Sequence, residues 1–293
     1  MEVVLNVECH AHIALDGVSY AAAAARNANQ PDEQAARAAL SAYRAAGITF
    51  VRDGGDKWGV SALAKQLAPE YGIDYRTPLF AIHKRGHYGS IVGRAFDTLT
   101  DYASLVDEAE RHGADFIKIM TTGIMDFDSF GRITGQPLER EEVCEMVHIA
   151  HEHGLAVMSH TNGRDAVLDA IEAGADSIEH GNYIDDDCIA ALAQSRTCLV
   201  PTATVARNLI GSGIGDDAVL TRIWEASQQV ICKAHAANCL VACGSDAGAV
   251  GVPHGQGASD ELRCFTDTLG GGEDCLEWLE RGAQFISTTF TRH

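Results

Sequence analysis

Short apolar runs alternate with amphipathic segments along almost the whole chain, and this alternation restricts the fold more than any other feature. A unit of helix-like segment, glycine and apolar run occurs four times, around Gly47, Gly113, Gly154 and Gly174. Glycine in this position is typical of a helix C-cap, where the backbone turns left-handed. Strands that alternate regularly with helices predict an α/β protein with a parallel sheet.

Eight of the apolar runs have the length of buried strands, and amphipathic segments of helical length separate most of them. The predicted strands are 3–7, 48–52, 79–82, 116–120, 156–159, 177–179, 198–200 and 240–243. The predicted helices are 33–46, 60–69, 102–112, 140–153, 164–173, 185–194 and about 217–238, and we expect a last helix within 259–290.

Eight alternating units favour a (β/α)8 TIM-type barrel, and the alternative is a doubly wound open sheet. The chain has 293 residues without a long linker or low-complexity tract. Barrels of this class reach ~250 residues as one unit. We therefore expect residues 1–293 to form a single barrel domain.

Charge and cysteine content exclude several classes of partner. The chain carries 41 acidic and 22 basic side chains, a formal charge of −19, which argues against nucleic acid and against an anionic membrane. No apolar run approaches the ~18 residues of a membrane span, and the amino terminus lacks the basic start of a signal peptide. Nine irregularly spaced cysteines are typical of a reducing compartment. We expect a cytoplasmic protein that acts on a small molecule.

The first strand runs into Cys9-His10-Ala11-His12. Residues i and i+2 of a strand face the same side, so the imidazoles of His10 and His12 can reach one point in the mouth of a barrel. Two converging imidazoles are a common arrangement for zinc. Taken alone, the pair could equally be two polar residues at a strand end.

Lys118 lies inside the apolar run 116–120, which we expect to be the fourth strand. A lysine buried there loses hydration, and this disfavours its charged form. The neutral amine could act as a base, form a Schiff base or react with carbon dioxide to give a carbamate. Alternatively, Lys118 lies at the edge of the strand and extends its amine to solvent.

Three further metal-capable side chains follow predicted strands. His160 ends the fifth strand, His180 ends the sixth, and Asp246 follows the eighth. Active sites of these barrels lie at the carboxyl ends of the strands. Five strands thus bring such a side chain to one place, which indicates a metal centre.

With this order of residues, the chain resembles the amidohydrolase superfamily, in particular its imidazolonepropionase-like and Xaa-Pro dipeptidase-like branch. The longer matching segments are Ile-Lys-Ile-Met at 117–120, Ser-Ile-Glu-His-Gly at 177–181, Leu-Val-Pro-Thr at 199–202 and Gly-Ser-Asp-Ala-Gly at 244–248. The resemblance covers about residues 5 to 265. Most relatives also carry a small accessory β-sandwich domain; we expect none here, which leaves a homo-oligomer open.

The resemblance implies a binuclear centre of two divalent metal ions, usually Zn²⁺. The ligands that it implies are His10, His12 and Asp246 for the buried metal, His160 and His180 for the exposed metal, and Lys118, carboxylated by carbon dioxide, as a bridge together with a hydroxide. Asp246 is also the implied catalytic proton acceptor, because a carboxylate beside the attacking hydroxide can pass its proton to the leaving group.

Other residues are candidates for contacts with the substrate. His87 and Tyr88 lie where the family has a Gly-His pair that faces the substrate, and His87 is expected to polarise the scissile carbonyl or to bind a substrate carboxylate. Arg85 and Arg207 are cations near loops at the mouth and could pair with a carboxylate. His254 follows the eighth strand. Asp53, at the end of the second strand, is expected to orient a ligating imidazole.

We therefore expect a metal-dependent amidohydrolase that cleaves a dipeptide, an N-acyl amino acid or a cyclic amide. The alternative is a lactonase or phosphotriesterase-like hydrolase. A deaminase is disfavoured, because its Glu would follow His160 closely and 161–163 are Thr, Asn and Gly. A non-catalytic barrel scaffold is a further alternative, marked by lost ligands, whereas here the set is complete.

Overall fold

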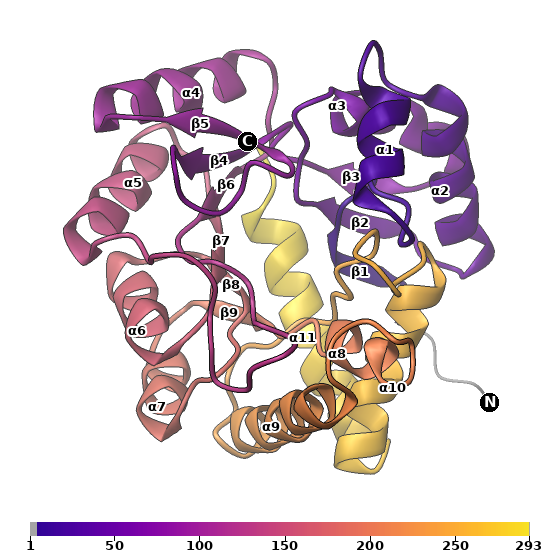
Figure 1. The fold of residues 1–293 in the computed structure, drawn as a ribbon, viewed down its shortest axis with the longest axis vertical. Helices are drawn as coiled ribbons and strands as arrows, with labels where there is room; N and C mark the ends of the chain where they lie inside the picture. Colours follow the sequence, from indigo (N-terminus) through magenta and orange to yellow (C-terminus); the bar gives the residue numbers. More distant parts are fainter. Residues whose placement is uncertain (1–4, 293) are drawn as a thin grey trace.

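The computed structural model describes residues 5–292, which form a ring of parallel strands surrounded by helices (Figure 1). The strands are β1 (Val7–Ala11), β2 (Phe50–Asp53), β3 (Asp74–Arg76), β4 (Ala81–Lys84), β5 (Gly93–Phe96), β6 (Ile117–Met120), β7 (Val157–Thr161), β8 (Ser177–His180) and β9 (Cys198–Val200).

The helices follow the strands in the order that the alternation predicts. They are α1 (Tyr20–Asn27), α2 (Glu33–Ala45), α3 (Val60–Leu67), α4 (Leu99–Arg111), α5 (Arg140–Glu152), α6 (Arg164–Ala173), α7 (Asp186–Gln194), α8 (Thr204–Leu209), α9 (Asp217–Ala236), α10 (Gln256–Leu269) and α11 (Glu273–Thr289), with a 3-10 turn η1 (Ala68–Tyr71). Side-chain caps start several of them: Asp216, for example, accepts from the N–H groups of Ala218 and Val219. The four glycines of the repeated unit all have left-handed φ values, which lie between 68° and 85°.

Hydrogen bonds connect the strands into a closed ring. The parallel pairs run β1-β2-β3 and β5-β4-β6-β7-β8-β9. Asp115 N–H donates to Thr77 O at 2.9 Å and joins the third strand region to β6. On the other side, residues 240–246 act as the eighth strand: Leu199 N–H donates to Leu240 O at 2.9 Å, and Cys9 N–H donates to Cys243 O at 3.0 Å. The predicted α/β barrel is confirmed.

The carboxyl-terminal part of α11 packs against the interior of the ring, on the side away from the carboxyl ends of the strands. Figure 1 shows α11 (yellow) between β1–β2 and β7–β9. Its residues Ala283 and Ile286, together with Phe290 at its C-cap, belong to one buried cluster with Phe116 and Met158. Because side chains alternate along a strand, Lys118 and His160 lie two residues further along the same faces as Phe116 and Met158. The apolar layer therefore supports the polar layer that forms the site.

Several predicted boundaries are wrong. The first strand is 7–11 rather than 3–7. Glu8 and His10 interrupt the apolar run, yet both have buried hydrogen-bond partners and belong to the strand. Residues 3 and 4 of the predicted strand lie outside the described residues. The single predicted helix within 259–290 is two helices, α10 and α11, which glycines 270–272 separate. The predicted strand 79–82 corresponds to β4, Ala81–Lys84, and starts two residues later because Leu79 has a left-handed φ of 67°.

Four elements were not predicted, namely β3, β5, α1 and α8, each of eight residues or fewer. Among residues 5–292, every strand belongs to one of the two parallel sheets, so this part of the chain contains no accessory β-sandwich. Within the same residues, no helix combines the length and the apolar character needed to cross a bilayer.

Candidate metal centre

His10 and His12 converge with Asp246 at the carboxyl end of β1. The two Nε2 atoms are 3.4 Å apart, and Oδ1 of Asp246 lies 3.5 Å from the first and 3.6 Å from the second. The N–H of Asp246 donates to His10 O at 2.8 Å, which ties the eighth strand to β1 at this point. Ligands that surround zinc tetrahedrally at ~2.0–2.2 Å are separated by about this distance, so the triangle fits a single cation.

His160 and His180 approach this triangle from β7 and β8. Nε2 of His160 donates to Gly123 O at 3.1 Å, which leaves Nδ1 free, and Nδ1 of His180 bonds to Thr202 Oγ1 at 2.8 Å, which leaves Nε2 free. The two rings are 4.5 Å apart between centroids. Each imidazole therefore has one nitrogen anchored to the protein and the other available for a metal.

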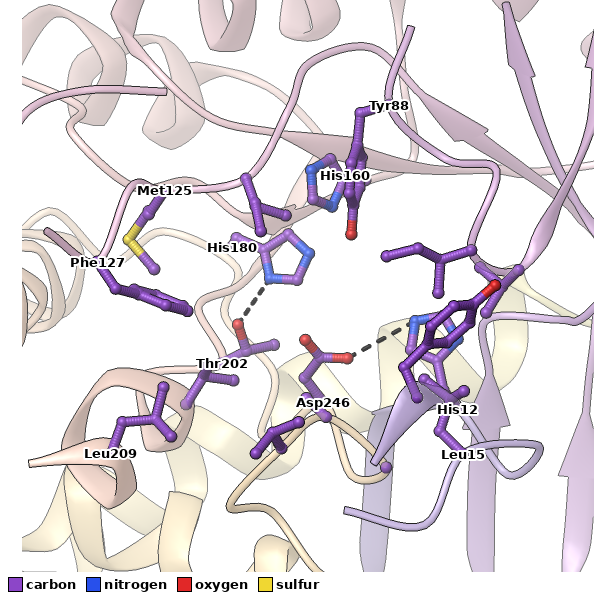
Figure 2. Close-up of a pocket in the computed structure, with 18 of the residues that line it drawn as sticks. His12, Leu15, Tyr88, Met125, Phe127, His160, His180, Thr202, Leu209 and Asp246 are labelled. Atoms are coloured by element: carbon purple, nitrogen blue, oxygen red, sulfur yellow. Dashed lines mark hydrogen bonds and ion pairs between the residues drawn. The ribbon is translucent and has the colours of Figure 1, made fainter. Parts of the chain in front are cut away.

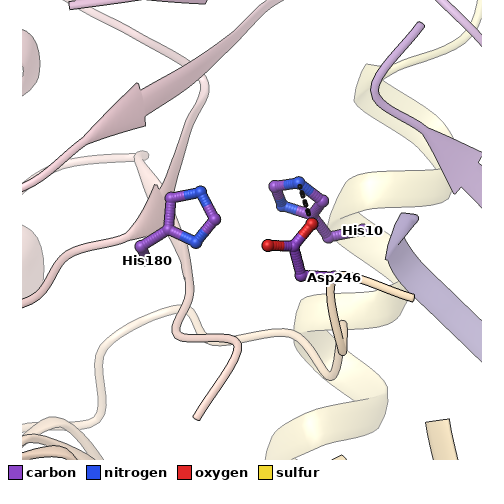
Figure 3. Close-up of side chains that lie close together, drawn as sticks. All are labelled: His10, His180 and Asp246. Atoms are coloured by element: carbon purple, nitrogen blue, oxygen red, sulfur yellow. Dashed lines mark ion pairs between the residues drawn. The ribbon is translucent and has the colours of Figure 1, made fainter. Parts of the chain in front are cut away.

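His180 lies close enough to His10 and Asp246 to connect the two groups of proposed ligands. His10, His180 and Asp246 each offer a ligand atom, and these atoms lie within 4.8 Å of one another (Figure 3). His180, Thr202 and Asp246 have left-handed φ values of 71°, 50° and 61°. Such backbone costs ~1–3 kcal/mol for each residue that is not glycine, and here it turns the strand ends inward toward one point.

Lys118 lies on β6 among these imidazoles. Its side chain is fully buried, and its Nζ has no hydrogen-bond partner. Burial lowers the pKa of Lys118 to about 8, against the opposing effect of Glu179. A buried amine without a partner is costly as it stands, and a carbamate on Nζ would supply the anionic ligand that four imidazoles do not provide.

Burial also keeps the imidazoles neutral. It lowers the pKa of His12 and of His160 to about 3, with a smaller effect from the charge of Lys118, and it lowers the pKa of His10 and of His180 as well. Metal binding needs neutral imidazole. The donor set, four neutral imidazoles with a carboxylate and an unpartnered amine, fits two divalent cations.

Glu179 and Arg52 lie beneath His10 in contacts that the sequence analysis missed. Oε2 of Glu179 accepts from Nδ1 of His10 at 2.7 Å, and Arg52 donates to both carboxylate oxygens at 2.9 and 3.0 Å. Arg52 also donates to Ser177 Oγ at 2.8 Å and lies 4.3 Å from the ring centre of Phe290. The sequence signal that could have found them is a charged residue inside each of two short buried strands, β2 and β8.

Asp53 has a different role from the predicted one. Its oxygens accept from the backbone N–H groups of Ile13 and Gly55, both at 2.8 Å, so it holds the loop after β1 rather than an imidazole. Gly54 leaves space for His12, because a Cβ there would lie 2.4 Å from the ring atom Cε1.

Two predicted substrate residues, His87 and Tyr88, are neighbours in sequence, but their side chains lie in different places. His87 has its Nδ1 bonded to Gln136 O at 3.0 Å in an exposed position, so the expected contact with the scissile carbonyl is not made from there. Tyr88 stacks on His160 with 4.9 Å between ring centroids. Figure 2 shows its hydroxyl directed into the space between His180, Asp246 and His12.

The other predicted substrate residues do not line the cavity. Arg85 is exposed and paired with Asp97 at 2.8 Å, and Arg207 is paired with Asp267 at 2.7 Å. His254 is held between Tyr43 Oη and Leu15 O, each at 2.9 Å. For these three residues, a partner within the protein occupies the group that was expected to bind substrate.

A cavity of about 420 Å³ opens above the centre (Figure 2). His12, His160, His180 and Asp246 lie in its floor, and most of the other lining residues are apolar. Its volume is typical of a small-molecule site.

Comparison with known proteins supports a family assignment. A model of the amidohydrolase family matches residues 7–291. An uncharacterised protein of Mycobacterium bovis is 30% identical over an alignment of 195 residues, which covers 60% of this chain and 50% of that protein. An uncharacterised protein of Mycobacterium tuberculosis matches to the same extent. The match thus spans about half the length of these curated relatives.

Solved structures agree in fold. A Xaa-Pro dipeptidase with bound methionine has a TM-score of 0.75 and 20% identity, covering 97% of this chain and 75% of the other. Ochratoxinase of A. niger has a TM-score of 0.74 and 21% identity, covering 97% and 70%. At these identities the likeness concerns the fold, whereas the family match covers nearly the whole chain. The chain belongs to the amidohydrolase family.

Proposed function

We propose that this protein is a metal-dependent hydrolase that cleaves an amide bond with two divalent cations, zinc being the usual choice for such ligands. The observation that carries the proposal is the convergence of four neutral imidazoles and Asp246 around Lys118, whose buried Nζ has no partner. His10, His12 and Asp246 would hold one cation, and His160 and His180 the other. Lys118, as a carbamate, would bridge them.

When bound, the cations would activate a water molecule and polarise the carbonyl of the substrate. Asp246 is suited to the proton transfers. Burial raises the pKa of Asp246 to about 6, although the charge of Lys118 opposes this shift. A carboxylate beside the attacking water can accept its proton and return it to the leaving nitrogen.

Tyr88 replaces His87 as the proposed partner of the scissile carbonyl. Burial raises the pKa of Tyr88, so its hydroxyl stays protonated and can donate a hydrogen bond to oxygen as negative charge develops there. Stacking on His160 fixes the direction of the ring.

The comparisons favour an amide as the bond that is cleaved. Relatives in fold include a Xaa-Pro dipeptidase and a bottromycin amidohydrolase. The alternative is a lactone or a phosphotriester, since an activated water at such a centre can attack either.

We also propose a reducing compartment such as the cytoplasm. All nine cysteines are free in the structure, and seven of them are buried. Titration of thiols in freshly isolated, unfolded protein should find all nine reduced, and a stable disulfide would contradict this proposal.

Elemental analysis combined with a hydrolysis assay tests the proposed function. Protein produced in zinc-supplemented medium should contain about two metal ions per chain and hydrolyse at least one amide. Removal of the metal by a chelator should abolish hydrolysis, and added zinc or manganese should restore it. A metal content near zero, with no activity restored by either metal, would refute the proposal.

A further inference from the structure

The walls of the cavity above the metal centre are almost entirely apolar. Several loops supply these walls together with α8, namely the loops after β1, β4, β6 and α8 and the segment after Asp246. Figure 2 shows Met125, Phe127 and Leu209 on the side opposite to Leu15. The apolar lining residues are Leu15, Val18, Ile91, Val92, Met120, Ile124, Met125, Phe127, Val205, Leu209, Ile214, Ala249 and Val250.

Most polar side chains of the lining already have partners within the protein. Oδ1 of Asn162 accepts from Asn182 Nδ2 at 2.8 Å, and Nδ2 of Asn162 donates to Gly123 O at 3.1 Å. Thr202 is bonded to His180. These groups hold the imidazoles, so they do not offer a strong site for a charged substrate group. The Tyr88 hydroxyl remains as a donor directed into the cavity.

No lysine or arginine of the described chain lines the cavity. The two cations that were expected near the mouth, Arg85 and Arg207, pair with Asp97 and Asp267, and Lys84 at the end of β4 pairs with Glu142 at 2.7 Å. A carboxylate held against the apolar walls, away from the proposed cations in the floor, would lose hydration and gain no cationic side chain in return, which is unfavourable.

The apolar lining continues to the surface at the rim. Val18, Tyr20 and Ile214 line the cavity and are 76%, 39% and 43% exposed. Large exposed apolar side chains that gather at one opening mark a binding surface for an apolar partner. Here they surround the entrance to the metal centre.

We infer that the substrate is a neutral amide with bulky apolar groups and without a free carboxylate beside the scissile bond. This inference rests on the proposed function and separates this chain from enzymes that act on dipeptides or N-acyl amino acids. The apolar walls would bind the substituents, and Tyr88 would donate to the carbonyl oxygen.

Matched substrates test the inference on the metal-loaded protein. N-Hexanoyl-phenylalaninamide and N-hexanoyl-phenylalanine differ only in the terminal amide or carboxylate. We expect kcat/KM for cleavage of the hexanoyl amide to be at least about tenfold higher for the neutral compound, the scale of one uncompensated buried polar group. Equal values, or a preference for the carboxylate, would overturn the inference.

Two exposed isoleucines provide a variant and its control. Ile214→Arg adds a cation at the rim and should improve the relative kcat/KM of the carboxylate substrate by roughly 1.5-fold to fivefold, the effect of a partly exposed charge pair. Ile210→Arg adds the same charge at a position that is 37% exposed and does not line the cavity, and it should leave the ratio unchanged. Equal effects of both variants would count against the inference.

Binding distinguishes failure of this inference from failure of the proposed function. If the metal-loaded protein hydrolyses neither compound, nor any other amide, the proposed function fails. Calorimetric titration of the purified protein with the same two compounds still decides the substrate class. Tighter binding of the neutral compound supports the inference, and equal or tighter binding of the carboxylate overturns it.

Discussion

Glu179 and His10 form a fully buried hydrogen bond of 2.7 Å, in which Nδ1 of the imidazole donates to Oε2 of the carboxylate. Arg52 binds the same carboxylate through both oxygens. The contact selects the tautomer of His10 whose Nε2 is free to face Asp246, and an anionic partner makes that nitrogen a stronger ligand. The buried pair of Arg52 and Glu179 thus orients His10, a proposed metal ligand.

Glu179→Gln should weaken metal binding. The amide has nearly the same shape but no negative charge, so it cannot support both Arg52 and His10 as the carboxylate does. We expect metal affinity, measured by competition with a chromophoric chelator, to fall by about 10–100-fold. The exposed Glu277→Gln on α11 is the control. Unchanged affinity in Glu179→Gln would remove Glu179 from the positioning of His10.

Arg52→Leu should destabilise the fold through the charge that it leaves behind. Both partners are fully buried, and removing one partner of a buried pair costs about 3–5 kcal/mol. The double variant Arg52→Leu with Glu179→Leu should be less destabilised than Arg52→Leu alone, because no unpaired charge remains. Chemical unfolding of the metal-free proteins measures both values. A double variant that is the less stable of the two would contradict this explanation.

Lys118→Ala should lose metal and activity together. Truncation removes the proposed bridging ligand and leaves space beside the imidazoles. A short carboxylic acid such as propionate can occupy that space and supply the missing anion, so it should restore part of both. Metal content and hydrolysis, each measured with and without propionate, provide the check. Full metal occupancy in Lys118→Ala would show that the lysine is not a ligand.

Asp246→Asn should reduce kcat by about 10²–10⁴-fold, the usual scale for general acid–base catalysis. In the parent, kcat/KM should fall at low pH, because the carboxylate then takes up a proton. The variant should lack this acidic limb. A pH–rate profile of both proteins, with metal content measured at each pH, checks the expectation. Near-parental kcat at full metal occupancy would exclude Asp246 from proton transfer.

The buried imidazoles should make the metal-free fold sensitive to acid. Burial lowers the pKa of His12 to about 3, so between pH ~6.5 and ~3 the unfolded chain takes up a proton that the folded chain does not. Stability from this group is complete above pH ~6.5 and is lost as the pH falls, at about 1.4 kcal/mol per pH unit. Glu8 and Glu261 act in the opposite direction, because burial raises their pKa values to about 8 and about 7.

Comparison of His12→Asn with the parent isolates the contribution of the imidazole, since both proteins retain the two glutamates. The variant should lose less stability than the parent between pH 6.5 and 4.5, as measured by denaturant unfolding in the presence of a chelator. The exposed His148→Asn on α5 is the control. Parallel stability curves for His12→Asn and the parent would contradict the neutral, buried state of His12.

The barrel and the proposed ligands follow from local sequence patterns. Alternating strands and helices predict a parallel ring, and parallel strands place all their carboxyl ends on one side. A side chain that follows an apolar run is therefore located by its position in the sequence alone. His10, His160 and His180 could be assigned to one site in this way, before any contact between them was known.

Substrate-facing residues could not be assigned in the same way, because they lie on loops. The conformation of the loop around His87 and Tyr88 decides which of the two side chains enters the cavity, and no strand period applies there. The predicted cations Arg85 and Arg207 were close to the mouth in sequence, yet Asp97 and Asp267 bind them elsewhere.

The sequence by itself determined the ring of strands and the side at which the metal-capable residues end, because both depend on periodicity and on chain order. Tertiary structure alone decided the pair of Arg52 with Glu179, which 127 residues separate, and the apolar cavity, whose walls come from separate loops. The physical reason is that a buried charge or an apolar wall is defined by neighbours distant in sequence, and only the folded chain brings these neighbours into contact.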